Sequence, residues 1–263
     1  MILHDSLPYR PWSDPALKRL PGVQPLGALP WLLQDEVFAA QMAERDRLLA
    51  RHRAQVLADS DDPAVAELLS AVLAYLAGCR GYAVSSQAVR RPDGVTVDLA
   101  ADGPMATLAR LVQEDLLLHV KRGDEHVLIG GTLLFPSSWT LAEKAGRPLS
   151  RIHRPVPSYA AVARSVQRMF DALRPGTPLW RANWLIYRDP ALFQPRREGE
   201  RKPARDGAPG YLRSERQTFL KLPGTGAVVF GIHTYVLPLD RFAAELPPGA
   251  LRESDRPAAG PGA

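Results

Sequence analysis

The sequence predicts an α+β fold in which helices come first and an antiparallel sheet follows. Apolar residues recur with helical spacing between Asp35 and Cys79, and with strand-like runs and alternation after Ala83. The composition agrees, because 46% hydrophobic and 23% charged residues are ordinary for a folded chain of 263 residues. We expect one large domain at residues 35–246, a proline-rich arm at 1–34 and a disordered tail at 247–263.

The N-terminal part of the domain predicts a pair of helices. Six prolines lie within residues 1–34, so this arm is expected to be extended and to lie over the domain. The first helix is predicted over residues 35–58. The second is predicted over residues 63–79, because Asp62 and Pro63 form an N-cap followed by a first-turn proline.

Strands dominate the rest of the chain. A turn signal at residues 91–94 favours a short hairpin. Longer strands are predicted over residues 115–120, 126–135, 179–187, 212–222 and 227–237. Helices predicted over residues 104–112 and 159–173 interrupt this series, so we expect an antiparallel sheet with inserted helices.

Charge and cysteine usage exclude several classes of protein. The formal net charge is +5, but the 33 basic residues are mostly arginine and spread along the chain, so nucleic-acid binding is not expected. The single cysteine, Cys79, excludes an internal disulfide and an iron–sulfur cluster held by this chain alone. No run approaches the ~18 apolar residues of a membrane span. The first residues lack a secretory pattern, so no membrane association and a cytoplasmic location are expected.

Common catalytic motifs are missing. The sequence has no glycine-rich phosphate loop, no G-x-S-x-G elbow and no two histidines three or four residues apart. This argues against a nucleotide-binding fold, an esterase and a helical zinc pair. His119 and His126 could face each other across a hairpin, but no third metal ligand is evident.

The segment from Gly130 to His153 is rich in polar and aromatic residues. Prolines at positions 155 and 157 follow His153 and stiffen the backbone behind it. A rigid backbone aims a side chain at low entropic cost, which suits a metal ligand or a general base. A polar histidine that caps the approach to the next helix explains the pattern equally well.

Two later strands carry arginines at alternating positions. Residues 180–184 place Arg181 and Asn183 on one face, and residues 212–218 place Arg213 and Arg216 on opposite faces. A buried arginine requires an anion. Structural carboxylates and an anionic ligand both remain open as that partner.

Taken together, these stretches resemble the haem-binding alpha subunit of the haem-dependent oxidative N-demethylases, the dimethylamine monooxygenase-like proteins. The similarity covers about residues 20–240 in order and without large gaps. Its signatures are VQEDL, FPSSW followed by EK.G, IHRPVPSY, RANW and LRSERQTFLKLP. Each is weak alone, but the set is specific to the family.

The resemblance implies a PAS-like sheet that holds non-covalent haem b. It implies that dioxygen and a small secondary amine such as dimethylamine bind at the iron, and that a methyl group leaves as formaldehyde. Electrons would come from NADPH through FMN and iron–sulfur partner subunits in an oligomer, which agrees with the single cysteine. Two alternatives stay open: a haem-binding PAS-like sensor or storage protein without turnover, and an interaction domain that has lost the cofactor.

The resemblance also implies ligands for the haem. His153 is expected to bind the iron, with His119 and His233 as rivals. Arg213, Arg216 and Arg181 are expected at the haem propionates or at the distal pocket, and Arg213 is expected to take part in catalysis.

The remaining expected site residues would line the haem pocket. Gly130 and Gly131 would let the porphyrin plane approach the backbone. Tyr159, Trp139 and Trp184 would line the pocket, and Tyr159 is expected to take part in catalysis, although aromatic core packing is an alternative role.

Overall fold

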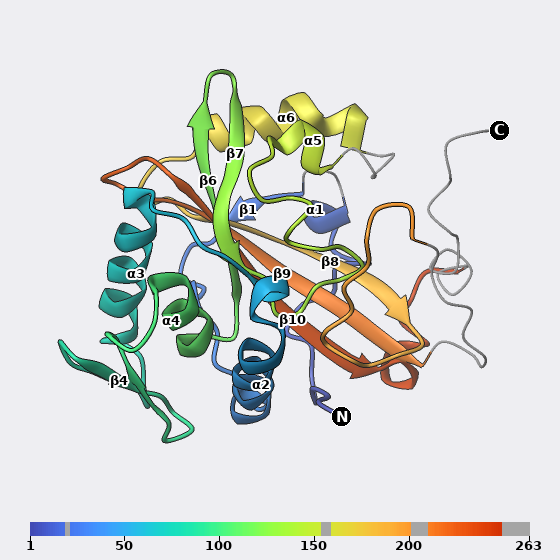
Figure 1. Cartoon of the computed structure of the whole chain (residues 1–263). Coiled ribbons are helices and arrows are strands. Elements are labelled where there is room, and N and C mark those ends of the chain that lie inside the picture. Colours follow the sequence, from blue (N-terminus) through green and yellow to red (C-terminus); the bar gives the residue numbers. More distant parts are fainter. Residues whose placement is uncertain (19–21, 154–158, 201–209, 249–263) are drawn as a thin grey trace.

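A large antiparallel sheet lies at the centre of the molecule, with helices on both sides (Figure 1). The structure is a computed structural model that describes residues 1–18, 22–153, 159–200 and 210–248, with the backbone alone at 159–162. The prediction of an α+β fold is confirmed. Most of the tail predicted to be disordered lies outside the described residues, and the predicted domain limits stay a prediction.

Five long strands form most of the sheet. They are β6 (Asp115–Arg122), β7 (Glu125–Thr132), β8 (Leu179–Tyr187), β9 (Tyr211–Lys221) and β10 (Val228–Pro238). Their order across the sheet is β8-β9-β10-β6-β7, and every pair is antiparallel. The first long strand therefore pairs with the last in the middle of the sheet, and the helices between the second and third lie on one face, a PAS-like arrangement.

β7 ends at Thr132, three residues before the end predicted for this strand. The amides of Leu134 and Phe135 donate to the carboxylate of Asp115 instead of to a neighbouring strand, each at 2.8 Å. The buried side chain of Asp115 thus replaces the backbone hydrogen bonds of a neighbouring strand at this point. The periodicity of the sequence alone does not reveal this replacement.

The register divides the side chains of β9 and β10 between two faces. One face carries Glu215 and Phe219, opposite Thr234 and Phe230 of β10. We call it the helix face, because α5 (Leu149–Ile152) and α6 (Tyr159–Ala172) cover it. The other face is called the arm face.

The predicted N-terminal helix pair is confirmed. α2 (Phe38–Val56) packs against α4 (Pro104–Leu111) and the segment after β7. α3 (Pro63–Leu76) packs with α4 against the arm face. Asp62 caps α3 by accepting a hydrogen bond from the Ala64 amide at 3.0 Å, as its position before Pro63 predicts.

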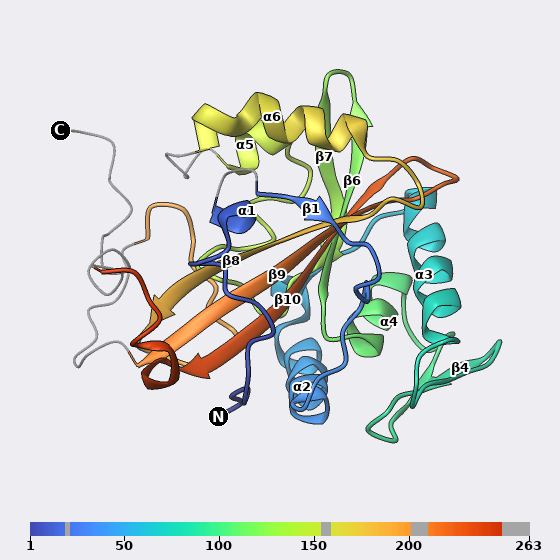
Figure 2. The same cartoon turned by 180° about the vertical axis from the view of Figure 1, so that it is seen from behind.

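The N-terminal arm runs across the arm face (Figure 2). Two short elements interrupt its extended course: α1 (Pro15–Lys18) and β1 (Gln24–Pro25), which pairs with β8. The backbone amide of His4 donates to the carbonyl of Val236 on β10 at 2.8 Å. The arm is thus bound to the sheet near its start, at His4, and again at Gln24–Pro25.

The smaller elements complete the fold. β2 (Leu57–Ala58) pairs with β7 at one edge of the large sheet. The predicted hairpin is present as a three-stranded sheet of β3 (Ala83–Val84), β4 (Ala88–Arg90) and β5 (Thr96–Asp98). A 3-10 turn, η1 (Leu239–Phe242), follows β10. No helix in the described ranges is long and apolar enough to cross a bilayer.

Candidate functional site

Three histidines gather on the helix face beneath α5 and α6. His119 lies on β6 and His126 on β7, and the rings of both contact Phe170 of α6, with centroids 5.5 and 5.1 Å apart. His153 directly follows α5 and is close enough to His119 to influence its titration. The structure therefore brings the expected iron ligand and one of its rivals to one place.

Burial keeps the imidazoles of this cluster neutral. It lowers the pKa of His119 to about 3, and positive charge on His126 or His153 would lower that pKa further. Burial also lowers the pKa of His153 and of His126. Neutral imidazole is the form that ligates metals. Nδ1 of His119 is buried and makes no hydrogen bond with the described residues, which leaves it able to accept a further partner.

A buried lysine holds the backbone that leads into His153. Lys144 Nζ donates to the carbonyl of Ile152 at 2.6 Å and pairs with Glu198 Oε1 at 2.6 Å. Nδ1 of His153 lies 3.0 Å from the carbonyl of Leu149, one turn earlier. With the proton on Nδ1, that bond fixes the ring and makes Nε2 the nitrogen with metal-binding character. Residues 154–158 and the side chain of Tyr159 lie outside the described part of the chain.

Apolar and aromatic side chains share the helix face with the three histidines. Trp139, Ile152 and Phe230 pack against a cluster that includes Leu117 of β6. Phe230 is stacked on Phe219 of β9 at a centroid distance of 5.0 Å, and Phe219 in turn contacts Phe170 of α6. Trp139, which was expected to line the pocket, therefore lies on the same face as His153.

Arg213 and Asp115 fix the start of the FPSSW segment. Asp115 accepts the two backbone bonds that end β7, and Arg45 of α2 pairs with it at 2.9 Å. Arg213 donates to the carbonyl of Phe135 at 2.6 Å and to that of Leu192 at 3.1 Å. Its Nε is buried and has no hydrogen-bond partner among the described residues. Arg213 thus holds the wall of the site, and one of its donors is unused.

A carboxylate, Glu215 of β9, lies in the middle of the helix face. Glu215 Oε2 accepts hydrogen bonds from Asn183 Nδ2 at 3.0 Å and from Gln217 Nε2 at 3.1 Å. Arg181 lies opposite Gln217 in the register, and the charge of Glu215 partly offsets the lowering of the Arg181 pKa by burial. Within the described ranges, neither Glu215 Oε1 nor the buried Nε of Arg181 makes a hydrogen bond. Alternation on β9 was the available signal, since it places Glu215 on the face of Phe219.

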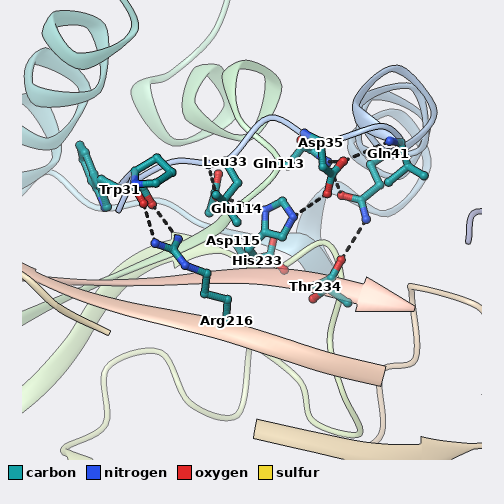
Figure 3. A network of polar contacts seen from close by, with 12 residues as sticks. Trp31, Leu33, Asp35, Gln41, Gln113, Glu114, Asp115, Arg216, His233 and Thr234 are labelled. Atoms are coloured by element: carbon teal, nitrogen blue, oxygen red, sulfur yellow. Dashed lines mark hydrogen bonds and ion pairs between the residues drawn. The ribbon is translucent and has the colours of Figure 1, made fainter. Parts of the chain in front are cut away.

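Arg216, Trp184 and His233 lie on the arm face, away from His153. Arg216 donates to the carbonyls of Trp31 and Pro30, at 3.3 and 2.5 Å, so its partners are backbone groups of the arm (Figure 3). Trp184 packs edge-on against Trp12 of the arm at a centroid distance of 5.7 Å. A single planar group bound by His153 would not also reach these side chains through the sheet.

His233 belongs to a buried polar network that includes the VQEDL segment (Figure 3). Its Nδ1 lies 3.1 Å from Glu114 Oε1 and its Nε2 lies 2.9 Å from Asp35 Oδ2. Gln113 Nε2 donates to Asp35 Oδ1 at 2.8 Å and to Gln41 Oε1 at 2.9 Å. Burial alone would lower the pKa of His233, but its bonds to the two carboxylates raise it to about 9.

Packing within the protein explains why glycine occupies positions 130 and 131 of β7. A Cβ on Gly131 would lie 2.7 Å from the carbonyl oxygen of Leu116, and one on Gly130 would lie 3.0 Å from that of Ala58. Both contacts are with backbone, which cannot move aside as a flexible side chain can. Close packing of β7 against β6 and β2 therefore requires glycine here without any ligand.

The residues of the helix face fit a haem group. A non-covalent haem needs an imidazole for its iron, apolar contact for its ring and cationic donors for its propionates. The face offers buried neutral histidines, the stacked Phe219 and Phe230, and arginines with unused buried Nε atoms. The fold is that of a PAS-like α+β protein, and its helix face carries side chains of the kinds that a planar metallocofactor requires.

Comparison with known families gives the particular assignment. A family model described as haem-dependent oxidative N-demethylase, alpha subunit-like, matches residues 22–254. The chain belongs to this family, and the resemblance seen in the sequence is confirmed. Membership makes haem the cofactor, oxidative N-demethylation the class of reaction and a multi-subunit complex the setting in which such a chain acts.

Proposed function

We propose that this chain is the catalytic haem subunit of an oxidative N-demethylase that acts on a small secondary amine such as dimethylamine. The observation that carries the proposal is the neutral histidine cluster on the helix face of a chain that belongs to this family. The reaction consumes the amine, dioxygen, two electrons and two protons, and yields the primary amine, formaldehyde and water. With one cysteine, the chain relies on flavin and iron–sulfur partner subunits for electrons from NADPH.

His153 is the proposed iron ligand. Its ring is fixed by Leu149 and its backbone by Lys144, so both its orientation and its tautomer are set before a cofactor binds. His119 stays a rival on the same face, whereas His233 lies on the arm face, opposite Arg216 in the register. Bound haem would supply the iron at which dioxygen is activated.

Glu215 is the proposed binding group for the substrate. A small secondary amine is a cation at neutral pH, and a carboxylate of low exposure is the side chain that would select it. Asn183 and Gln217 both donate to Oε2, which orients the carboxylate and leaves Oε1 as an acceptor for an ammonium N–H. Arg213 and Arg181 are the proposed partners of the propionates. Tyr159 stays a proposed pocket residue from the family resemblance, and the glycines and Arg216 are explained by the protein contacts described above.

The test is reconstitution followed by product analysis. The purified chain is loaded with haem, reduced chemically, and exposed to dioxygen and dimethylamine while formaldehyde and methylamine are measured. We expect equimolar formation of both products, and a Glu215→Gln variant with a raised KM for the amine but an unchanged Soret band. Haem binding without product, even with a reductase present, would overturn the proposal in favour of a sensor or storage protein. Absence of a Soret band would exclude both.

A further inference from the structure

A second group of metal-ligating side chains lies on the arm face, apart from the haem site. His4 Nε2, Asp35 Oδ2 and His233 Nε2 lie within 4.8 Å of one another, and both histidines are fully buried. We propose that His4, Asp35 and His233 bind one divalent transition-metal ion of the zinc class, which fastens the N-terminal arm to β10.

The spacing of the three atoms suits such an ion. Asp35 Oδ2 lies 3.0 Å from His4 Nε2 and 2.9 Å from His233 Nε2. Ligands that sit about 2.0–2.1 Å from a zinc ion lie roughly 2.9–3.4 Å from each other. An ion would therefore enter with small side-chain movements, replacing the protons that these atoms now share.

Each ligand also has an outer partner of the kind that metal sites use. Glu114 Oε1 lies 3.1 Å from His233 Nδ1, which forms the carboxylate–histidine arrangement common behind zinc. Gln113 holds the other oxygen of Asp35 at 2.8 Å. His4 Nδ1 accepts a hydrogen bond from the Val236 amide at 3.1 Å and lies 3.3 Å from the Val236 carbonyl, so metal binding at Nε2 would move the ring proton to Nδ1 and exchange the amide contact for the carbonyl one.

The charge of the cluster favours a divalent cation. Asp35 and Glu114 bring two carboxylates into a buried site, and Glu114 Oε2 has no hydrogen-bond partner among the described residues. One protonated imidazole leaves a net negative charge, which is costly to bury. A divalent ion with two neutral imidazoles balances both carboxylates.

The consequence of the site is structural. His4 and Asp35 are at the two ends of the arm, and His233 lies on the central strand β10. One ion would thus close the arm into a loop and tie that loop to the sheet. Because the role of this ion is structural, it needs no coordination position open to substrate. Zinc, which is common in structural sites, therefore fits better than a redox-active metal.

The experiment is a zinc titration of the haem-loaded protein after treatment with a chelator. We expect one zinc per chain by calorimetry and by elemental analysis alongside iron. His4→Ala should abolish saturable binding, and Glu114→Gln should weaken it about 10–100-fold, since it removes the outer carboxylate but keeps its shape. His52→Ala is the matched control, because His52 lies on α2 outside the cluster, and it should leave binding unchanged.

A second measurement follows the arm directly. Zinc should slow tryptic cleavage after Lys18 of the arm in the wild type and leave the rate in His4→Ala unchanged. The proposal is overturned if the wild type shows no one-equivalent site in large excess of zinc, or if His4→Ala binds zinc as the wild type does. In either case His233 holds a proton between its two carboxylates instead of a metal. The outcome is independent of demethylase activity, so it fails separately from the proposed function.

Discussion

Arg45→Met should be among the most destabilising single changes in the chain. The Arg45 side chain is fully buried and donates to Asp115 Oδ1 at 2.9 Å and to the carbonyls of Ala109, Gln113 and Glu114 at 2.8, 3.1 and 2.9 Å. Removing one partner of a buried ion pair costs about 3–5 kcal/mol, because the other charge stays buried without compensation. In a chain of this size that free energy corresponds to a fall in Tm of roughly 6–20 °C.

The assay is urea unfolding of the haem-free protein followed by circular dichroism. Arg47→Met is the matched control, since Arg47 lies on the same helix but pairs with Glu44 at the surface, and its unfolding midpoint should not change. The double variant Arg45→Met/Asp115→Asn should recover part of the loss, because the stranded charge is gone. A loss below about 1 kcal/mol for Arg45→Met would refute the reasoning, since buried ion pairs broken on one side cost several times that.

Three further predictions follow. Gly131→Ala should lower the free energy of unfolding by about 1–3 kcal/mol in urea titrations, because its Cβ meets backbone at 2.7 Å, whereas Gly210→Ala enters open space and should be neutral. A folded-state pKa of about 3 for His119 against 6.5 when unfolded means that stability is lost as the pH falls below 6.5. In the haem-free protein, the loss of unfolding free energy should reach about 2 kcal/mol at pH 5, and His119→Leu should lack this part of the pH dependence. If the unfolding free energies of the wild type and of His119→Leu fall equally steeply with pH, the prediction is wrong. Lys144→Met should weaken haem binding about tenfold or more in a titration, because Lys144 fixes the backbone before His153, and unchanged affinity would remove its positioning role.

Local patterns predict the elements of this fold well. Asp62 and Pro63 begin α3 as expected, and strict alternation places Arg213 and Arg216 on opposite faces of β9. These features depend on a few neighbouring residues, so a single sequence contains enough information. The end of β7 is predicted wrongly because Asp115, about twenty residues earlier, takes the amides that would continue the ladder.

The sites depend on contacts that no local pattern contains. His4, Asp35 and His233 converge although 31 and 198 residues separate their hydrogen-bonded pairs. In the sequence, nothing distinguishes Glu215 from other polar residues on strands. Only the strand register, which places Asn183 opposite Glu215, shows that its carboxylate is held in place. Several residues of the sequence motifs serve to hold the arm and the FPSSW segment, as Arg216 and Arg213 do.

The central claim is that His153 binds haem iron on the helix face. Absorption and electron paramagnetic resonance spectra of the haem-loaded protein test it most directly, with His153→Ala and His119→Ala compared with the wild type. The account predicts that the histidine-ligand signature and tight haem binding disappear in His153→Ala and persist in His119→Ala. An unchanged ligand signature in His153→Ala, or its loss in His119→Ala alone, would contradict the account and move the iron to His119.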